Sequence, residues 1–294
     1  MNLTPESKVL IQGITEPLFS THAARMKAYG TNVVAGVNPG QGGQILHDIP
    51  VFDLVEQALA AVGSIDTTII FVGPYQALDA ALEAIAAGIR QIVIVSAGMP
   101  PLDMVRLLRK TESTETLVVG PNSPGIIVPG KILLGTHALE FYTPGVVGIV
   151  SRSSTLTYEI AYGLTLAGLG QSISVSIGSD ALAGSSFLQW LQILDEDETT
   201  QAIVLVGEPG GLSEEAAAQY IAEAIDKPVI AYVAGHHAPA GKHWGHAGAL
   251  AQVVGRGANV GTVQSKLAAF KKANVPIAER PSQIPDLVKK ALKI

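Results

Sequence analysis

The sequence contains no cysteine among its 294 residues. This absence excludes disulfide bonds, thiolate metal sites and a cysteine nucleophile, and it fits a reducing compartment. Basic residues are also in the minority, because 19 lysines and arginines face 25 acidic residues and give a formal charge of −6. Nucleic-acid binding requires a basic surface, so we expect neither DNA nor RNA as a partner.

Long hydrophobic runs and a secretory signal are missing as well. No apolar run reaches the roughly 18 residues of a membrane-spanning helix. The N-terminal stretch MNLTPESKVLIQG lacks the basic start and the apolar segment of a signal peptide. We therefore expect a cytoplasmic protein with no membrane partner.

What the sequence does contain is a regular alternation of short apolar runs with alanine-rich segments, which is typical of parallel βαβ units. The apolar runs predict strands in residues 8–13, 32–37, 67–73, 91–98 and 116–122, then in 146–151, 172–178, 202–208 and 228–235. Helix formers with a spacing near 3.6 residues fill the intervals. The sequence therefore predicts an α/β fold with doubly wound sheets.

The alternation breaks between Pro121 and Pro144, where proline and glycine are concentrated. We expect one domain over residues 1–125, a connecting segment over 126–144 in which residues 131–141 offer only a short strand or hairpin, and a second α/β domain over 145–294. A chain of this length has room for two hydrophobic cores.

Four loops of the second domain follow predicted strands and are rich in glycine and serine. They are SRSST (151–155), GSDALAGSS (178–186), GEPGG (207–211) and GHHAPAGKHWGHAG (235–248). Ligands of open parallel sheets bind where such loops gather, and helices that begin with serine or threonine present free N–H groups to anions. The alternative is that glycine and serine only form turns and N-caps here. Four such loops together favour a phosphate site.

Two histidines, His243 and His246, lie in the last of these loops. A neutral imidazole can attack phosphorus near pH 7 if an acceptor holds its other nitrogen. Glu208, at the end of the predicted strand 202–208, is a candidate for that acceptor. The alternative reading is that His246 caps a turn and that Glu208 is a solvated residue at a strand end.

The first domain does not have the pattern of a nicotinamide-binding protein. Its first turn, QGITEPLFSTH, contains one glycine where the dinucleotide-binding pattern has three. Asn38 and Pro39 stand at the end of the second strand, where an acidic residue normally binds the ribose. NAD is therefore disfavoured.

Five motifs, taken together, closely resemble the α subunit of succinate–CoA ligase (succinyl-CoA synthetase), and the resemblance covers nearly the whole chain. In chain order they are VNPGQGG, PNSPG, VGIVSRSSTLTYE, GEPGG and GKHWGHAGA. The resemblance implies a Rossmann-like CoA-binding domain followed by a flavodoxin-like domain. It also implies reversible formation of succinyl-CoA from succinate, CoA and a nucleoside triphosphate.

The same resemblance assigns roles to individual residues. It implies that His246 becomes phosphorylated and that Glu208 holds it, and it leaves His243 without a role. It implies that the phosphate is bound by Ser153, Ser154 and Thr155, and that Tyr158 lies near the acyl substrate. For CoA, it implies contacts at Thr15, Gln41, Val95, Ser96 and Asn122.

The chain departs from the family on the side that would bind CoA. Where the family has TGSQG, this chain has residues 15–19 with the sequence TEPLF, so Pro17 offers no N–H and Glu16 repels phosphate. Gln41 replaces a lysine of the family. The phosphohistidine motifs are nearly intact, whereas CoA contacts have changed.

The chain has no Walker sequence, and the resemblance implies that ATP or GTP with Mg²⁺ is bound by an ATP-grasp β subunit. The implied assembly is αβ or α2β2. Two alternatives stay open: a non-catalytic or regulatory paralogue with weakened CoA binding, and a ligase for a related small acid such as malate or citrate. The choice between ATP and GTP also stays open.

Overall fold

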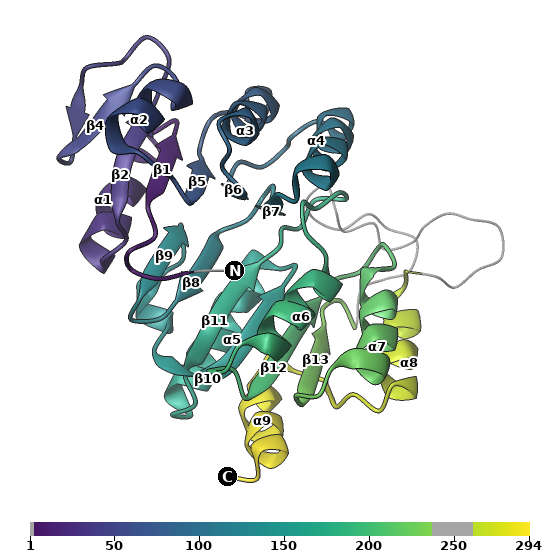
Figure 1. The fold of residues 1–294 in the computed structure, drawn as a ribbon. Helices are drawn as coiled ribbons and strands as arrows, with labels where there is room; N and C mark the ends of the chain where they lie inside the picture. Colours follow the sequence, from purple (N-terminus) through teal and green to yellow (C-terminus); the bar gives the residue numbers. More distant parts are fainter. Residues whose placement is uncertain (1–2, 237–260) are drawn as a thin grey trace. The chain divides into compact units, whose positions relative to one another are not determined.

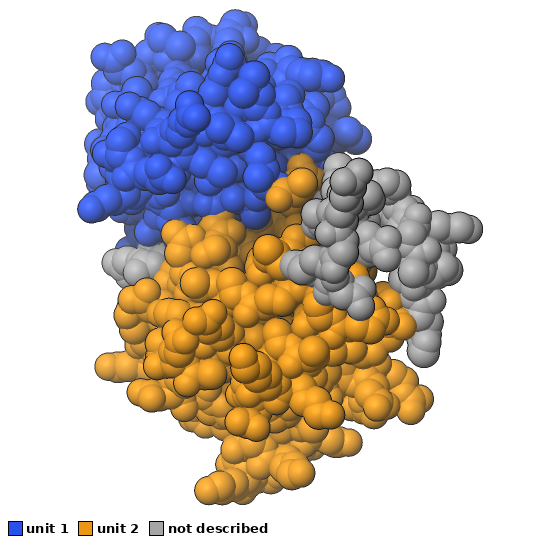
Figure 2. Space-filling model, turned by 90° about the vertical axis from the view of Figure 1, so that its right-hand side faces the viewer, with its two compact units in different colours: residues 1–137, 182–184 blue, residues 138–181, 185–294 orange. Residues whose placement is uncertain are grey.

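The computed structural model describes residues 3–236 and 261–294 of the chain. Two compact units emerge, one formed by residues 1–137 with 182–184 and the other by residues 138–181 with 185–294 (Figure 2). Among the described residues, no helix combines the length and the hydrophobicity that crossing a bilayer requires.

The first sheet has seven strands in the order β3-β4-β2-β1-β5-β6-β7. All neighbouring pairs are parallel except β3 and β4. Read in chain order without the short β3, this is the arrangement 3-2-1-4-5-6 of a Rossmann sheet. The strands are β1 (Val9–Gln12), β2 (Val33–Val37), β3 (Ile45–Leu46), β4 (Ile49–Phe52), β5 (Thr67–Ile70), β6 (Gln91–Ile94) and β7 (Leu117–Val119).

Helices cover the first sheet because its strands are apolar on both faces, as parallel strands usually are. One continuous core joins α2, α3 and α4 to β1, β2, β5, β6 and β7. In α3 the buried residues recur at one-turn spacing, for example Ala77, Ala81 and Ala84, which places a single stripe against the sheet. The helices are α1 (Ser20–Tyr29), α2 (Val55–Val62), α3 (Ala77–Ala86) and α4 (Pro101–Thr114) (Figure 1).

The second sheet has the order β14-β13-β12-β10-β11-β8-β9. The strands β10 to β14 are parallel and follow the flavodoxin-like order, whereas β8 and β9 form an antiparallel hairpin. The strands are β8 (Gly125–Val128), β9 (Ile132–Gly135), β10 (Pro144–Ser151), β11 (Gln171–Ser176), β12 (Ala202–Gly207), β13 (Val229–Val233) and β14 (Ile277–Ala278).

The helices of the second unit form two layers. Helix α5 packs with α9, and α6, α7 and α8 pack in succession (Figure 1). Their bounds are α5 (Ser154–Leu166), α6 (Phe187–Glu196), α7 (Ser213–Ala224), α8 (Val263–Lys272) and α9 (Ile284–Leu292), with short 3₁₀ turns η1 (Leu139–Phe141) and η2 (Pro281–Gln283). The α/β class and the two sheet orders confirm the fold that the sequence predicted.

Candidate functional site

The parallel strands β10 and β12 are neighbours in the second sheet. The chain goes from β10 to β11 on one side of this pair and from β12 to β13 on the other, and ligands of open α/β sheets bind at such a switch in strand order. Ser151, the last residue of β10, is paired with Val206 of β12. The chain therefore leaves both strands at the same level. The SRSST and GEPGG loops begin side by side at this point.

Glu208 is the carboxylate of this pair of loops. Burial raises the pKa of Glu208, while a hydrogen bond from the side chain of Ser153 and the charge of Arg152 act in the opposite direction. The backbone N–H of Glu208 donates to Oε1 of Glu214 at 3.0 Å. The side chain is thus half-buried beside one hydroxyl and one guanidinium, which suits an acceptor for an imidazole N–H.

Arg152 belongs to this site, although the sequence reasoning assigned it no role. Its side chain is only 7% exposed. Nη2 donates to the carbonyl oxygen of Asp180 at 2.9 Å, and Nη1 lies 3.5 Å from Oγ of Ser213. Nε is buried and has no hydrogen-bond partner among the described residues. An arginine directly after a strand, inside a loop rich in serine, is the sequence signal that could have identified this cation.

Helix α5 begins at this site with Ser153 as its N-cap residue. The Ser153 hydroxyl does not bond to the first turn of the helix but is directed to Glu208. The Ser153 backbone is fixed by Ser151, whose hydroxyl accepts from the Ser153 N–H at 3.0 Å. Of the predicted phosphate-binding residues, Ser153 is buried, Ser154 is half-buried and Thr155 is exposed. The structure therefore brings Ser153 to Glu208 and places Ser154 and Thr155 on the first turn of α5.

Three other residues of the second domain were candidates in the sequence, His243, His246 and Tyr158. His243 and His246 fall within 237–260, outside the described residues. Tyr158 is one turn further along α5, and its ring lies 5.9 Å from that of Phe141 in η1. Tyr158 is therefore part of an aromatic group formed by α5 and η1.

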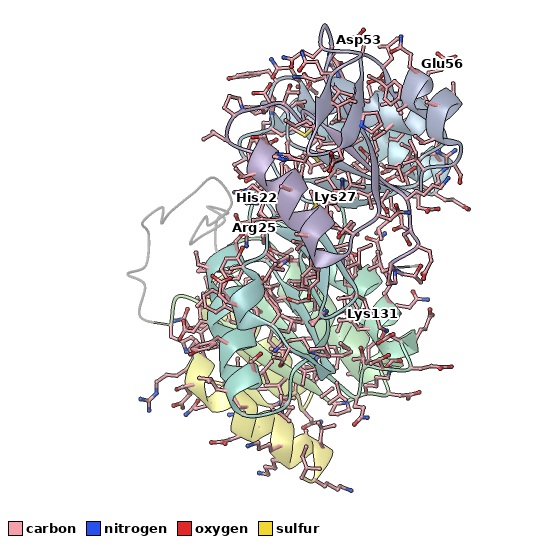
Figure 3. The ribbon with its side chains drawn as sticks, turned by 90° about the vertical axis from the view of Figure 1, so that its left-hand side faces the viewer. His22, Arg25, Lys27, Asp53, Glu56 and Lys131 are labelled. Carbon is pink, nitrogen blue, oxygen red and sulfur yellow. The ribbon has the colours of Figure 1, made fainter. Side chains whose placement is uncertain are left out.

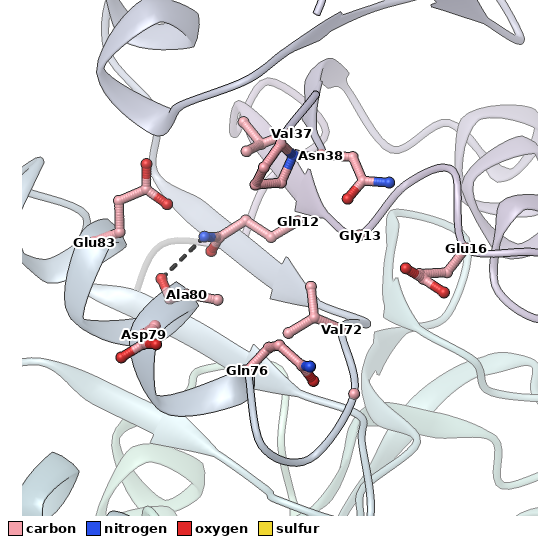
Figure 4. A pocket seen from close by; sticks show the side chains of 12 residues that line it. Gln12, Gly13, Glu16, Val37, Asn38, Val72, Gln76, Asp79, Ala80 and Glu83 are labelled. Atoms are coloured by element: carbon pink, nitrogen blue, oxygen red, sulfur yellow. Dashed lines mark hydrogen bonds between the residues drawn. The ribbon is translucent and has the colours of Figure 1, made fainter. Parts of the chain in front are cut away.

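The first unit contains a pocket of about 660 Å³ at the carboxyl ends of β1, β2 and β5 (Figure 4). Three amide side chains line it, from Gln12, Asn38 and Gln76. Gln12 Nε2 donates to the carbonyl oxygen of Ala80 at 2.9 Å, which ties β1 to α3. The sequence analysis assigned these amides no ligand contact. Carboxylates are present too, from Glu16, Asp79 and Glu83.

The five predicted CoA contacts all follow strands of the first sheet, and hydrogen bonds join several of these loops. Asn38 Nδ2 donates to Oγ1 of Thr15, and the N–H of Gln41 donates to the carbonyl oxygen of Asn38 at 3.1 Å. The N–H of Asn122 donates to the carbonyl oxygen of Ser96, the residue after Val95, at 2.8 Å. None of the five lines the described pocket. Thr15 and Gln41 bond to Asn38, and the Ser96 hydroxyl donates to the carbonyl oxygen of Val72, so these three residues support residues that line the pocket.

Family models match both parts of the chain. A CoA-binding domain model matches residues 4–98, and a CoA-ligase model matches residues 150–281. The chain is 44% identical to succinate–CoA ligase [ADP-forming] subunit alpha 2 of Archaeoglobus fulgidus, over 97% of both chains. The chain belongs to the family of CoA-ligase α subunits. Within this family it is also 45% identical to the malate–CoA ligase subunit alpha of Methylorubrum extorquens, over 85% of this chain and 86% of that one.

A solved structure supports the same fold for this α subunit. ATP citrate lyase from Methanothrix soehngenii, in complex with citrate and coenzyme A, superposes over the whole chain with a TM-score of 0.86 at 22% identity. This chain spans 52% of that longer chain. The two proteins therefore share the fold of both units.

The first unit fits CoA in part. Its amide-lined pocket suits the neutral, hydrogen-bonding parts of CoA, but no lysine or arginine is among the described residues that line it. The glycine loop after β2 is engaged by a carboxylate, because the N–H of Gly42 donates to Oδ1 of Asp53 at 2.8 Å. One group of basic side chains of this unit lies on α1, where His22, Arg25 and Lys27 are found (Figure 3). The residues that line the pocket therefore suit the neutral parts of CoA better than its phosphates.

Proposed function

We propose that this CoA-ligase α subunit forms succinyl-CoA from succinate, CoA and a nucleoside triphosphate, and that it does so through phosphorylation of His246. The site around Glu208 supports this proposal most strongly. A half-buried carboxylate stands beside Ser153 and Arg152 at the point where β10 and β12 end. A carboxylate in this setting can accept the N–H of an imidazole and stabilise the cation that forms when the other nitrogen is phosphorylated.

The proposed reaction has three reversible transfers. The imidazole nitrogen of His246 attacks the γ-phosphorus of the nucleotide, and the nucleoside diphosphate leaves. A succinate oxygen then takes the phosphoryl group, which frees the imidazole and gives succinyl phosphate. The CoA sulfur, as the thiolate, attacks the acyl carbon and releases inorganic phosphate. During these three transfers, Arg152 and Ser153 offset the free-energy cost of burying Glu208 as an anion.

The nucleotide with Mg²⁺ is proposed to bind to a partner of the ATP-grasp type, in an αβ or α2β2 assembly. Two relatives support this assembly, because each is an α subunit of a CoA ligase. Purified pairs of this chain and its β subunit, incubated with γ-labelled ATP or GTP, should give a phosphoprotein that is labile in acid and stable in base. His246→Asn should abolish the label, and His243→Asn should retain it. Equal labelling of His246→Asn and the wild type would exclude the proposed nucleophile.

Malate is the second candidate for the acid, because one relative at 45% identity is a malate–CoA ligase subunit. A coupled assay of the assembled enzyme across succinate, malate and citrate separates these candidates. We expect the highest kcat/KM with succinate. A preference for malate would keep the mechanism and change the substrate.

A non-catalytic paralogue is the rival function, and the carboxylates of the first unit favour it, since Glu16 lines the pocket and Asp53 binds the glycine loop. Calorimetry with CoA distinguishes the two. Heat of binding at micromolar to millimolar CoA supports the ligase. No heat at millimolar CoA with the β subunit present would favour the paralogue.

A further inference from the structure

A fully buried lysine stands next to the Glu208 loop. Lys266 of α8 has a side chain with no exposed surface, and its ammonium group has three hydrogen-bond acceptors. Nζ donates to the carbonyl oxygen of Gly211 at 3.0 Å, to Oε2 of Glu214 and to Oε2 of Glu215 at 3.2 Å. An ammonium group has three N–H donors, so this environment uses all of them.

The two carboxylates bound by Lys266 in turn hold backbone groups of two segments. Oε1 of Glu214 accepts the N–H of Glu208 at 3.0 Å. Oε1 of Glu215 accepts the N–H of Gly261 at 3.2 Å and the hydroxyl of Ser265 at 2.7 Å. The buried-charge network, which we define as Lys266, Glu214 and Glu215, thus holds both ends of the 208–211 loop and Gly261, which lies two residues before α8.

The two segments also approach each other so closely that only glycine fits. The N–H of Gly210 donates to the carbonyl oxygen of Gly261 at 2.9 Å. A Cβ at position 261 would lie 2.8 Å from the carbonyl oxygen of Gly211. A Cβ at position 207 would lie 2.6 Å from Cγ of Glu214. The backbone around Glu208 therefore has little freedom to move while the network is intact.

The charges of the network also act on the Glu208 carboxylate. The side chain of Glu208 is faced by Arg152 and Ser153 from the loop after β10 and by Glu214 from α7. The negative charge of Glu214 raises the pKa of Glu208. Lys266 is the cation that pairs with Glu214, and it also pairs with Glu215. A buried ion pair adds little stability compared with apolar side chains of the same volume. A role in holding the neighbouring groups in one arrangement therefore explains these buried charges better than a gain in stability.

We infer that the buried-charge network of Lys266, Glu214 and Glu215 positions Glu208 for the phosphoryl transfer, with Lys266 as its central positioning residue. The inference rests on the proposed function, because it assigns a task to residues that support the proposed acceptor. It adds residues of α7 and α8, outside the GEPGG loop, to the phosphoryl-transfer site.

The test compares two lysine variants of the assembled enzyme. Lys266→Met removes the central cation, and Lys227→Met serves as the control. Lys227 Nζ also donates to backbone carbonyl oxygens, those of Leu194 at 3.0 Å and Asp197 at 2.6 Å. Lys227 precedes β13, at the amino ends of the parallel strands, whereas Glu208 follows β12 at their carboxyl ends. We expect Lys266→Met to lower the single-turnover rate of phosphorylation by about 10- to 100-fold. The KM for nucleotide should stay within about twofold, since the nucleotide binds to the partner in the proposed assembly. Lys227→Met should phosphorylate at the wild-type rate.

The pH profile provides a readout that a purely structural lysine would not change. Without Lys266, the negative charge of Glu214, which raises the pKa of Glu208, has lost its paired cation, so we expect Glu208 to become protonated at a higher pH. The acid limb of the pH–rate profile should therefore move to higher pH in Lys266→Met and stay in place in Lys227→Met. Lys266→Arg should restore part of the rate because it keeps the charge.

A milder variant covers the case in which Lys266→Met does not fold. Glu215→Gln keeps one acceptor oxygen and replaces the other by an NH2 donor, and Glu215 lies at the more exposed end of the network. It should lower the phosphorylation rate and speed amide hydrogen exchange at Glu208 and Gly261, measured by mass spectrometry on the full chain. Unchanged exchange and an unchanged rate in Glu215→Gln would overturn the inference.

The two proposals fail in different ways. If the wild-type enzyme is not phosphorylated on His246, the proposed function fails whatever the lysine variants do. If the wild type is phosphorylated and Lys266→Met matches it in rate and in pH profile, the proposed function stands and the positioning role of Lys266 is refuted.

Discussion

Acidification should destabilise the first unit through His137. This side chain is fully buried, and its Nε2 lies 3.0 Å from the carbonyl oxygen of Gly125. Burial lowers the pKa of His137 from 6.5 to about 4, although the hydrogen bond to Gly125 opposes this effect. The folded state therefore keeps the imidazole neutral over a pH range in which the unfolded chain protonates it.

The direction of the effect follows from proton linkage. Above pH 6.5 both states hold a neutral His137, so the full stability is present there. Between pH 6.5 and about 4 the unfolded state binds the extra proton, and the free energy of unfolding falls as the pH falls. The difference between the two pKa values corresponds to a loss of about 3 kcal/mol.

Urea unfolding of the full chain from pH 4 to pH 7 measures this loss. His137→Gln removes the titrating group, and His47→Gln, at an exposed turn, is the matched control. Near pH 5 the wild type should take up about 0.9 more protons on unfolding than His137→Gln, and His47→Gln should not reproduce this difference. Parallel free-energy curves for the wild type and His137→Gln across this pH range would refute the reasoning.

Three further outcomes are expected at the second site, and each has its own measurement. Ser153→Ala removes a hydrogen bond that lowers the pKa of Glu208, so the acid limb of the phosphorylation rate should move to higher pH, with Ser153→Thr restoring it. Gly207→Ala brings a Cβ to 2.6 Å from Cγ of Glu214, so urea unfolding should show a loss of about 1–3 kcal/mol. Arg152→Met removes the cation that faces Glu208 among the described residues, so rapid-quench phosphorylation should slow by about 100-fold and recover in part in Arg152→Lys. A wild-type rate in Arg152→Met would remove that residue from the site.

Much of the fold could be predicted because parallel strands read as apolar runs. The run KVLIQG contains β1 and AIVLVGE contains β12, and both strands are fully buried. Shorter elements were missed. The two-residue strands β3 and β14 carry too few residues for any periodicity, and β8 lies in a stretch whose prolines and glycines predicted a break.

The sequence predicted site residues that lie within a single recognisable motif. Glu208 follows a strand in a glycine-rich loop, and the structure places it beside Ser153. Arg152 was missed because a charged residue after a strand is usually solvated, and its burial is a tertiary property. Lys266 lies 58 residues beyond Glu208 in the chain, so its link to that loop through Glu214 follows from the packing of α7 on α8.

The rate of phosphoenzyme formation in Glu208→Gln tests the central claim most directly. The wild type, Glu208→Gln and a control variant, Glu223→Gln, are each assembled with the β subunit and followed by rapid quench with γ-labelled ATP. Glu223 lies on the exposed surface of α7, so its variant should react at the wild-type rate. We expect Glu208→Gln to be slower by at least about 100-fold, because the imidazole loses the anion that holds its tautomer. Equal rates in all three proteins would contradict the role of Glu208 in the reaction.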